Sequence, residues 1–252
     1  IMKGKKKILF IHHGQGIGGA PTSMFQLIEA LNKDKFDIKI LFIYKSPLLI
    51  EICKEKGISY SVLGGFFFKK IYRYWKLSDA DIRNKILTPK KLLIITYKNI
   101  TTIISWFLIS FILGPRIINK EDVDLVHLNT TFLTDWLVAS KLAGKRPYVH
   151  VREPLSRGRF GIRRNIIRSL LKIYSQHIFA ISMDNKKRVG LEYKTTLVYN
   201  SFNLKNYRFL KQKKICQNNF KLIYLGKKKK RKGIDIILKT ANTLPEDIKI
   251  FM

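Results

Sequence analysis

A glycine-rich turn follows the first apolar run of the chain. Residues 13–22 read HGQGIGGAPT, in which Gly14, Gly16 and Gly19 fit the pattern G-x-G-x-x-G. Glycines let a backbone approach a phosphate closely, and the N-terminus of a following helix supplies free N–H groups. A nicotinamide dinucleotide also requires a carboxylate after the second strand, where residues 44–46 read YKS. The turn therefore predicts a phosphate- or sugar-facing loop, or a merely tight turn, and argues against a nicotinamide enzyme.

A run of cations forms the second segment whose residues could bind a ligand. Residues 226–233 read GKKKKRKG, again between an apolar run and a helical pattern. Six adjacent cations repel one another, and a bound anion lowers that cost. The loop follows a strand, where open α/β sheets bind their ligands, and it lacks the G-K-[ST] of a Walker loop. We interpret it as an anion-binding loop, with a solvated charged loop as the alternative.

Both segments need a scaffold of alternating strands and helices. Short apolar runs predict buried parallel strands, and apolar residues at helical spacing predict the helices between them. This alternation is typical of an α/β, Rossmann-like parallel sheet with helices on both faces. The predicted strands are residues 7–11, 36–44, 58–63, 123–128, 148–151 and 177–181, and the predicted helices are residues 21–31, 48–56, 133–144 and 160–176.

The pattern then repeats in a second, shorter unit. Residues 220–225 predict a strand, residues 234–244 a helix, and residues 248–252 the start of another strand. The polar, Lys-rich residues 203–218 predict a linker. We therefore expect an N-terminal domain over residues 1–202 and an incomplete C-terminal domain over residues 219–252, so the sequence is interpreted as a truncated one.

The apolar residues 92–113 read LLIITYKNITTIISWFLISFIL and are long enough to cross a bilayer. Lys98 and Asn99 interrupt them and leave an apolar run over residues 100–113. That length favours a core-facing helix, with an interfacial helix as the second interpretation and a membrane span as the third.

Four places in the chain resemble the retaining glycosyltransferases of family 4. Gly18-Gly19 matches the glycine pair of the family's N-terminal domain, and residues 123–127 (VDLVH) resemble its DIVH strand. Ser182 and residues 200–203 (NSFN) resemble the family's VS and NGVD pair, and residues 226–233 match the spacing of GR-x4-KG. The resemblance covers the whole chain as the N-terminal two-thirds of a two-Rossmann-domain, type B protein.

The resemblance implies transfer of a sugar from a nucleotide donor with retention, without a cofactor or metal. It implies that Lys227 and Lys232 hold the donor diphosphate, with Arg231 compensating for the family's missing Arg, and that Gly18 and Gly19 face the phosphate. Arg152 and Glu153 stand where many members carry a His near the reacting sugar, and they are the candidate catalytic residues. His127 and Asn129 are the candidate acceptor-side residues, whereas His150 is interpreted as a packed strand residue. The family's paired glutamates, which grip the donor, would lie beyond Met252, so the chain as given is expected to lack most of its donor pocket, and its own activity is left open.

The composition is strongly basic, with a net charge of +32. Residues 1–140 hold 21 basic and 11 acidic side chains, and residues 141–252 hold 28 and 6. Such a balance suits a polyanionic partner: phosphorylated substrates, an anionic membrane or nucleic acid. The basic helical segment over residues 157–172 and the segment over residues 92–113 suit docking on an anionic membrane. A basic binding module without catalysis is the alternative, but no nucleic-acid-binding signature is present.

Cys53 and Cys216 are isolated, without a second Cys or His at metal-ligand spacing. Two scattered thiols fit a reducing compartment. The apolar residues 8–11 are too few for a signal peptide. We expect a cytoplasmic bacterial protein, peripheral at the inner face of the cell membrane, that acts on a lipid-linked or surface-glycan acceptor.

Overall fold

The structure is a computed structural model of the 252-residue chain. It describes residues 4–14, 16–72, 89–155, 162–201, 220–224, 233–245 and 248–251. The chain divides into two compact units, Ile1–Asn203 and Leu204–Met252, and each is described by itself.

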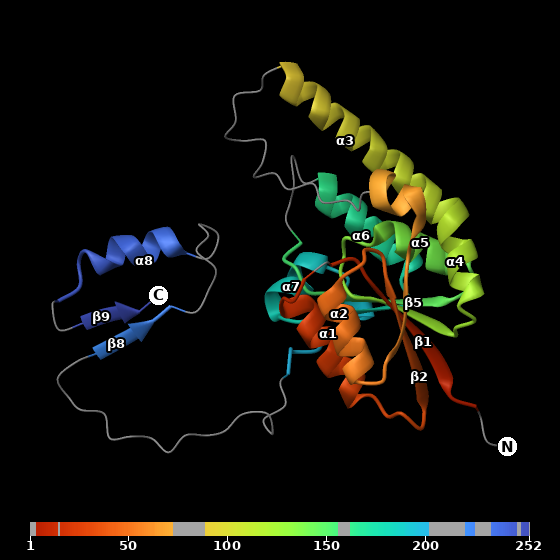
Figure 1. Cartoon of the computed structure of the whole chain (residues 1–252), viewed down its shortest axis with the longest axis horizontal. Coiled ribbons are helices and arrows are strands. Elements are labelled where there is room, and N and C mark those ends of the chain that lie inside the picture. Colours follow the sequence, from red (N-terminus) through yellow and green to blue (C-terminus); the bar gives the residue numbers. More distant parts are fainter. Residues whose placement is uncertain are drawn as a thin grey trace. The chain divides into compact units, whose positions relative to one another are not determined.

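The first unit is built on a seven-stranded parallel sheet with the strand order β3-β2-β1-β4-β5-β6-β7 (Figure 1). The strand order reverses between the central strands β1 and β4: β2 and β3 extend the sheet on the side of β1, whereas β5, β6 and β7 extend it on the side of β4. A ligand of an open α/β sheet binds outside the carboxyl ends of such strands. The strands are β1 Lys6–His12, β2 Phe36–Phe42, β3 Ser59–Val62, β4 Leu125–Leu128, β5 Arg146–Val151, β6 His177–Ala180 and β7 Thr195–Leu197.

Helices cover the two faces of the sheet because successive strand side chains point to opposite faces. Ile8 and Phe10 of β1 join a core cluster with the helices α1 and α2, whereas Leu9 and Ile11 join the cluster on the other face, where α5 contributes Trp136. The helices are α1 Gly19–Ala30, α2 Pro47–Glu55, α3 Pro89–Leu108, α4 Gly114–Lys120, α5 Thr134–Leu142, α6 Ile162–Tyr174 and α7 Met183–Val189; η1 Phe67–Ile71 and η3 Ile109–Leu113 are π-helical, and η5 Glu192–Lys194 is a 3-10 turn. The predicted fold class is confirmed.

The second unit contains a strand, a helix and a second parallel strand: β8 Phe220–Ile223, α8 Ile234–Ala241 and β9 Ile248–Phe251. Phe220 pairs with Ile248 and Ile223 with Phe251. The predicted strand–helix–strand order of this unit is therefore present. The cation run over residues 227–232 lies outside the described residues.

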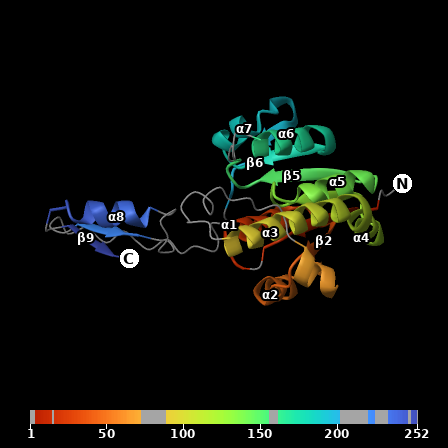
Figure 2. The ribbon, with the colours of Figure 1, turned by 90° about the horizontal axis from the view of Figure 1, so that it is seen from above.

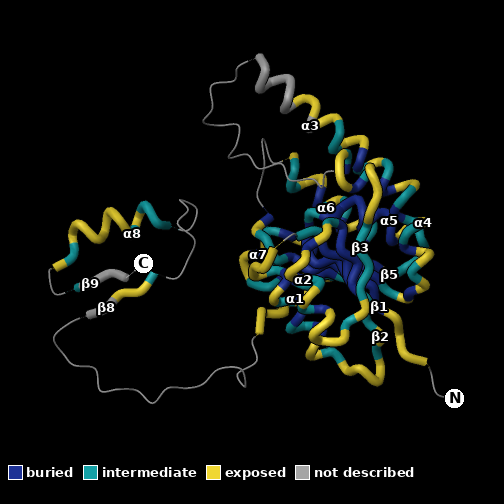
Figure 3. The backbone as a smooth tube through the Cα atoms, in the orientation of Figure 1, coloured by how far each residue is buried: buried dark blue, intermediate teal, exposed yellow. Residues whose placement is uncertain are grey.

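The segment over residues 92–113 differs from the core-facing helix that we expected. Among the side chains that the structure describes on α3 and η3, Ser105, Ile109 and Ser110 are buried, but most of the apolar ones are exposed to solvent, as the exposed stretches of α3 in Figure 3 show. The expectation is wrong because only one edge of this helix packs on the domain. By length and composition, residues Asn99–Lys120 are also a candidate membrane span, and 22% of the window is buried.

Candidate functional site

Polar side chains gather at the carboxyl ends of the central strands. His12 ends β1, Asn129 directly follows β4, and Arg152 directly follows β5. The register pairs Ile11 with Leu128 and Leu128 with Val149. Three neighbouring strands therefore deliver these side chains to one edge of the sheet.

Arg152 is the centre of this cluster. Its Nε donates to Oδ1 of Asn129 at 2.7 Å, and its Nη1 donates to Oδ1 of Asn200 at 3.0 Å. Its Nη2 lies 3.4 Å from Nδ1 of His150. Burial lowers the pKa of Arg152 to about 10, so the guanidinium keeps its charge at neutral pH. None of the ion pairs found among the described residues includes Arg152, so neutral amides hold a positive charge that an anion can still approach.

Asn129 links this cation to the glycine-rich turn. The Nδ2 of Asn129 donates to the carbonyl of Ala20 at 3.1 Å and lies 3.3 Å from Nδ1 of His12. Ala20 belongs to the first turn of α1, so the start of that helix is fixed beside Arg152. Burial lowers the pKa of His12 to about 3, which keeps its imidazole neutral. Sequence reasoning missed His12, although a polar residue at the end of the first apolar strand was the available signal.

The N-terminus of α1 is open at this edge. Gly18 occupies the N-cap position without a side-chain hydrogen bond, and the first turn contains no acidic residue. Gly18 and Gly19 are exposed, and a Cβ added to either would meet no atom within 4 Å. The free N–H groups and the partial positive charge of this helix end therefore remain available to an anion. This arrangement fits the prediction that Gly18 and Gly19 face a phosphate, which stays a prediction.

Glu153 supplies the one carboxyl group of the cluster. The hydroxyl of Thr130 and the backbone N–H of Thr131 donate to it, and burial raises its pKa. Its Oε2 is buried without a hydrogen-bond partner. A carboxyl group with one unused oxygen can accept a hydrogen bond or a proton from a hydroxyl group of a bound molecule.

The predicted site residues are only partly brought together. Arg152, Glu153 and Asn129 meet at the sheet edge beside Gly18 and Gly19 of α1. Lys227, Arg231 and Lys232 lie outside the described residues. His127 lies two residues before Asn129, within β4, and packs against Phe10 with ring centroids 4.6 Å apart. Its predicted acceptor-side role stays a prediction.

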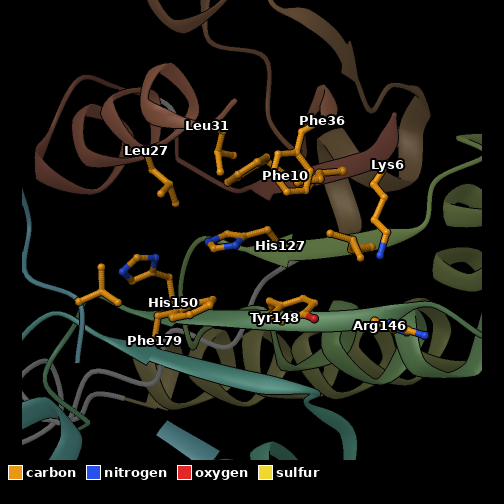
Figure 4. A pocket seen from close by; sticks show the side chains of 13 residues that line it. Lys6, Phe10, Leu27, Leu31, Phe36, His127, Arg146, Tyr148, His150 and Phe179 are labelled. Carbon is orange, nitrogen blue, oxygen red and sulfur yellow. The ribbon is translucent and has the colours of Figure 1, made fainter. Parts of the chain in front are cut away.

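His127 instead lines a cavity of about 420 Å³ on the face of the sheet beside α1 (Figure 4). Leu27 of α1 and Leu31, directly after that helix, form one wall, and Tyr148 and Phe179 stack at an interplanar angle of 11° on the sheet. His150, buried as expected, also lines it, and Nε2 of both His127 and His150 lacks a hydrogen-bond partner. Burial lowers the pKa of His127 to about 3 and that of His150 to about 2. The cavity is therefore apolar and uncharged at the histidines, unlike the site beside Arg152.

Within the described residues, no group of three or more His, Cys, Asp or Glu side chains is placed to hold a metal ion. Cys53 is a buried, free thiol, and burial raises its pKa to about 11.

Comparison with solved structures identifies the fold. HepE from Anabaena, in complex with UDP and glucose, is similar with a TM-score of 0.66 and 15% identity over 97% of this chain and 60% of HepE. A glycosyltransferase from Rickettsia africae gives a TM-score of 0.54 and 14% identity over 98% of this chain and 68% of its own. A UDP-N-acetylglucosamine 2-epimerase gives a TM-score of 0.50 and 12% identity over 98% of this chain and 63% of the epimerase. No protein-family model and no curated protein matches the chain.

These likenesses place the chain in the type B glycosyltransferase fold, as expected from its sequence. The chain spans about 60% of the length of the HepE structures. An epimerase shares the fold with glycosyltransferases, so the fold does not decide the reaction. The function must be argued from the residues at the sheet edge.

Proposed function

We propose that this protein is a glycosyltransferase that takes its sugar from a nucleotide donor. The observation that carries the proposal is the charge of Arg152, which neutral amides hold at the carboxyl edge of the sheet beside the open N-terminus of α1. Departure of a nucleoside diphosphate develops negative charge on phosphate oxygens. A fixed guanidinium and a helix N-terminus stabilise that charge without having to reorganise.

Glu153 supplies the second function that such a reaction needs. Its unpartnered Oε2 accepts a hydrogen bond from the attacking hydroxyl of the acceptor and orients it toward the donor sugar. The carboxyl group stays protonated to a higher pH than usual because it is buried. For Lys227 and Lys232, which lie outside the described residues, the resemblance to family 4 supports a role in binding the donor diphosphate.

The same resemblance supports the finer parts of the proposal. Transfer proceeds with retention at the anomeric carbon and without a metal, and the acceptor is lipid-linked or a growing bacterial surface glycan. The protein works in the cytoplasm, at the inner face of the cell membrane. UDP is the first nucleotide to test because the HepE complexes contain UDP and UDP-glucose.

Binding of UDP and UDP-glucose to the 252-residue chain tests the proposal, measured by saturation-transfer NMR. Lys227→Ala/Lys232→Ala should weaken UDP binding about tenfold or more, because two charge-assisted contacts to phosphate are lost. The matched control is Lys33→Ala/Lys35→Ala, which removes two exposed cations of the first unit. If both double variants bind UDP equally weakly, the protein attracts UDP only through its net charge, and the proposed donor site is overturned.

A turnover assay separates binding from chemistry. Release of UDP from UDP-glucose is measured with a mixture of lipid-phosphate acceptors, for the wild type and for Glu153→Gln. Faster release with the acceptor present, and its loss in the variant, supports the transferase. Nucleotide binding without any acceptor-dependent release by this chain contradicts transfer by this chain, although its donor site would stand.

A further inference from the structure

The face of α3 and η3 that points away from the domain carries a stripe of exposed apolar side chains. Tyr97, Ile100, Ile104, Phe107 and Phe111 recur at intervals of three and four residues, so they lie on one side of the helix. Between 47% and 66% of each of these five side chains is exposed. Ile103 and Ile112 widen the stripe. We call these seven residues the apolar stripe.

Aromatic contacts order the end of the stripe nearest the domain. The rings of Phe107 and Phe111 stack with centroids 6.0 Å apart, and Trp106 lies 5.3 Å from Phe107 and 6.2 Å from Phe111. Contiguous exposed apolar surface of this kind marks an interaction site, because water contacts it at a cost. Phe side chains on the apolar face of a helix are typical of helices that lie in a membrane interface.

The opposite side of the helix is fastened to the folded domain. The hydroxyl of Ser105 donates to the carbonyl of Ile71 at 3.3 Å, and Nε1 of Trp106 donates to Oγ1 of Thr134 at 2.9 Å. Ser105, Ile109 and Ser110 are buried. A helix that spans a bilayer must be free to meet lipid or other spanning segments all around, which these contacts prevent. The length of Asn99–Lys120 therefore does not make it a membrane span.

The charges around the stripe select its partner. Residues 89–120 contain five Lys or Arg and no Asp or Glu. Lys69 and Lys70 of η1, on the turn that accepts the hydrogen bond from Ser105, are exposed as well. An apolar face on a segment whose charged residues are all cations complements the surface of an anionic bilayer. A second copy of the chain would bring the same unbalanced cations together, so self-association through this stripe is disfavoured.

We infer that α3 and η3 form an interfacial membrane-docking helix, which buries the apolar stripe among the acyl chains of an anionic leaflet. The inference deepens the proposed location of the enzyme at a membrane but depends on neither its donor nor its reaction. Docking through the basic segment over residues 157–172, which overlaps α6, stays a prediction, although two of its cations contact the domain. Arg164 of α6 donates to the carbonyl of Leu155, and Arg163 lies 5.2 Å from the ring centroid of Phe132, so these cations serve the domain itself.

The docking helix is connected to the site at the sheet edge. Thr134, which accepts the bond from Trp106, begins α5, and the residues just before it include Thr130 and Thr131, which hold Glu153. A membrane under the apolar stripe therefore lies at a fixed position relative to Glu153. Such a connection suits an enzyme whose acceptor is held in the same membrane.

Vesicle flotation of the full 252-residue chain tests the inference without any substrate. Vesicles of phosphatidylcholine with about one-third phosphatidylglycerol should carry the wild type, and pure phosphatidylcholine should carry much less. Ile103→Ser/Phe107→Ser/Phe111→Ser should reduce the bound fraction on anionic vesicles about tenfold or more. The matched control is Leu48→Ser/Leu142→Ser, which removes two side chains that are each 51% exposed on other helices and should bind like the wild type.

Circular dichroism checks that both variants stay folded, which we expect because all five substituted side chains are exposed. Undiminished flotation of the stripe variant would show attraction by net charge alone and would overturn the inference, as would a wild type that binds neither vesicle. A wild-type dimer in size-exclusion chromatography that becomes a monomer in the stripe variant would also overturn it, in favour of a second copy. Failure of UDP binding leaves every one of these outcomes unchanged.

Discussion

Two pairs of polar residues, one pair within β4 and β5 and the other just past the ends of the same strands, have opposite surroundings. Asn129 and Arg152 stand just past the ends of β4 and β5 and are bonded to each other. His127 and His150 precede them within the strands, and both Nε2 atoms lack partners beside an apolar cavity. The four residues share one face of the sheet, since side chains two apart point the same way. Where the strands end, loops supply hydrogen-bond partners; within the strands, neither Nε2 atom has one, and Nδ1 of His150 lies near Arg152.

The comparison separates residues that can hold a charge from residues that cannot. Amide oxygens surround the guanidinium of Arg152, whereas the imidazoles of His127 and His150 stay neutral because burial disfavours their charged form. A polar residue type on a buried strand is therefore a poor guide to chemistry unless it lies at the strand's carboxyl end.

Replacing Arg152 should have the largest effect. Arg152→Ala removes the charge that we assign to the donor phosphate, and we expect kcat/KM with UDP-glucose to fall about 10²–10³-fold. Arg152→Lys keeps a charge but cannot bond Asn129 and Asn200 together, so it should recover only a minor part of the loss. Steady-state kinetics measure both. The matched control is Arg146→Ala, at the exposed start of the same strand, which should retain activity.

Glu153→Gln should reduce turnover about ten- to hundredfold while UDP affinity stays the same. Glutamine keeps the size of the side chain and an oxygen for the bonds from Thr130 and Thr131 but cannot take a proton. Burial raises the pKa of Glu153, so wild-type activity should already fall, as the pH is lowered, at pH values above the ordinary pKa of 4.5. The variant should not show this decrease. An unchanged profile of kcat against pH would remove Glu153 from the reaction.

Much of this arrangement follows from the sequence, and the part that does not has a physical reason. Apolar runs at strand spacing predicted the sheet, and the resemblance to family 4 predicted Arg152 and Asn129 as site residues. The bond from Arg152 to Asn200 could not be predicted, since it joins residues 48 apart that only the parallel order of β5, β6 and β7 brings together. Which of the described side chains of α3 and η3 are buried could not be predicted either, because packing against α5, not composition, decides which side of an apolar helix is covered.

Acid should destabilise the protein through its buried histidines. Burial lowers the pKa values of His12, His127 and His150 to about 3, 3 and 2, and each binds a proton on unfolding below pH 6.5. Each therefore lowers the free energy of unfolding by up to about 1.4 kcal/mol per pH unit below 6.5. Asp135 has the opposite effect, because burial raises its pKa to about 7 and it releases a proton on unfolding between pH 3.8 and 7.

The net slope should correspond to about two protons, with stability decreasing from about pH 6 to 5. Urea unfolding followed by circular dichroism at several pH values measures it. Stability that rises as the pH falls over this range would show that the histidines are charged in the folded state. The distinction between the two residue pairs would then be lost.

The smallest effects come from exchanging single residues two apart on β4. His127→Phe removes an unpartnered nitrogen and fills space beside the cavity, so the free energy of unfolding at pH 7 should rise by about 1 kcal/mol or less. Asn129→Leu at the same pH should lower it by about 2 kcal/mol, because the Nε of Arg152 and the carbonyl of Ala20 each lose their partner. Opposite signs support the assignment of function to the ends of the strands and of packing to their interiors. If His127→Phe lowers the free energy of unfolding as much as Asn129→Leu does, the imidazole has a stabilising partner, and the cavity becomes a second candidate site.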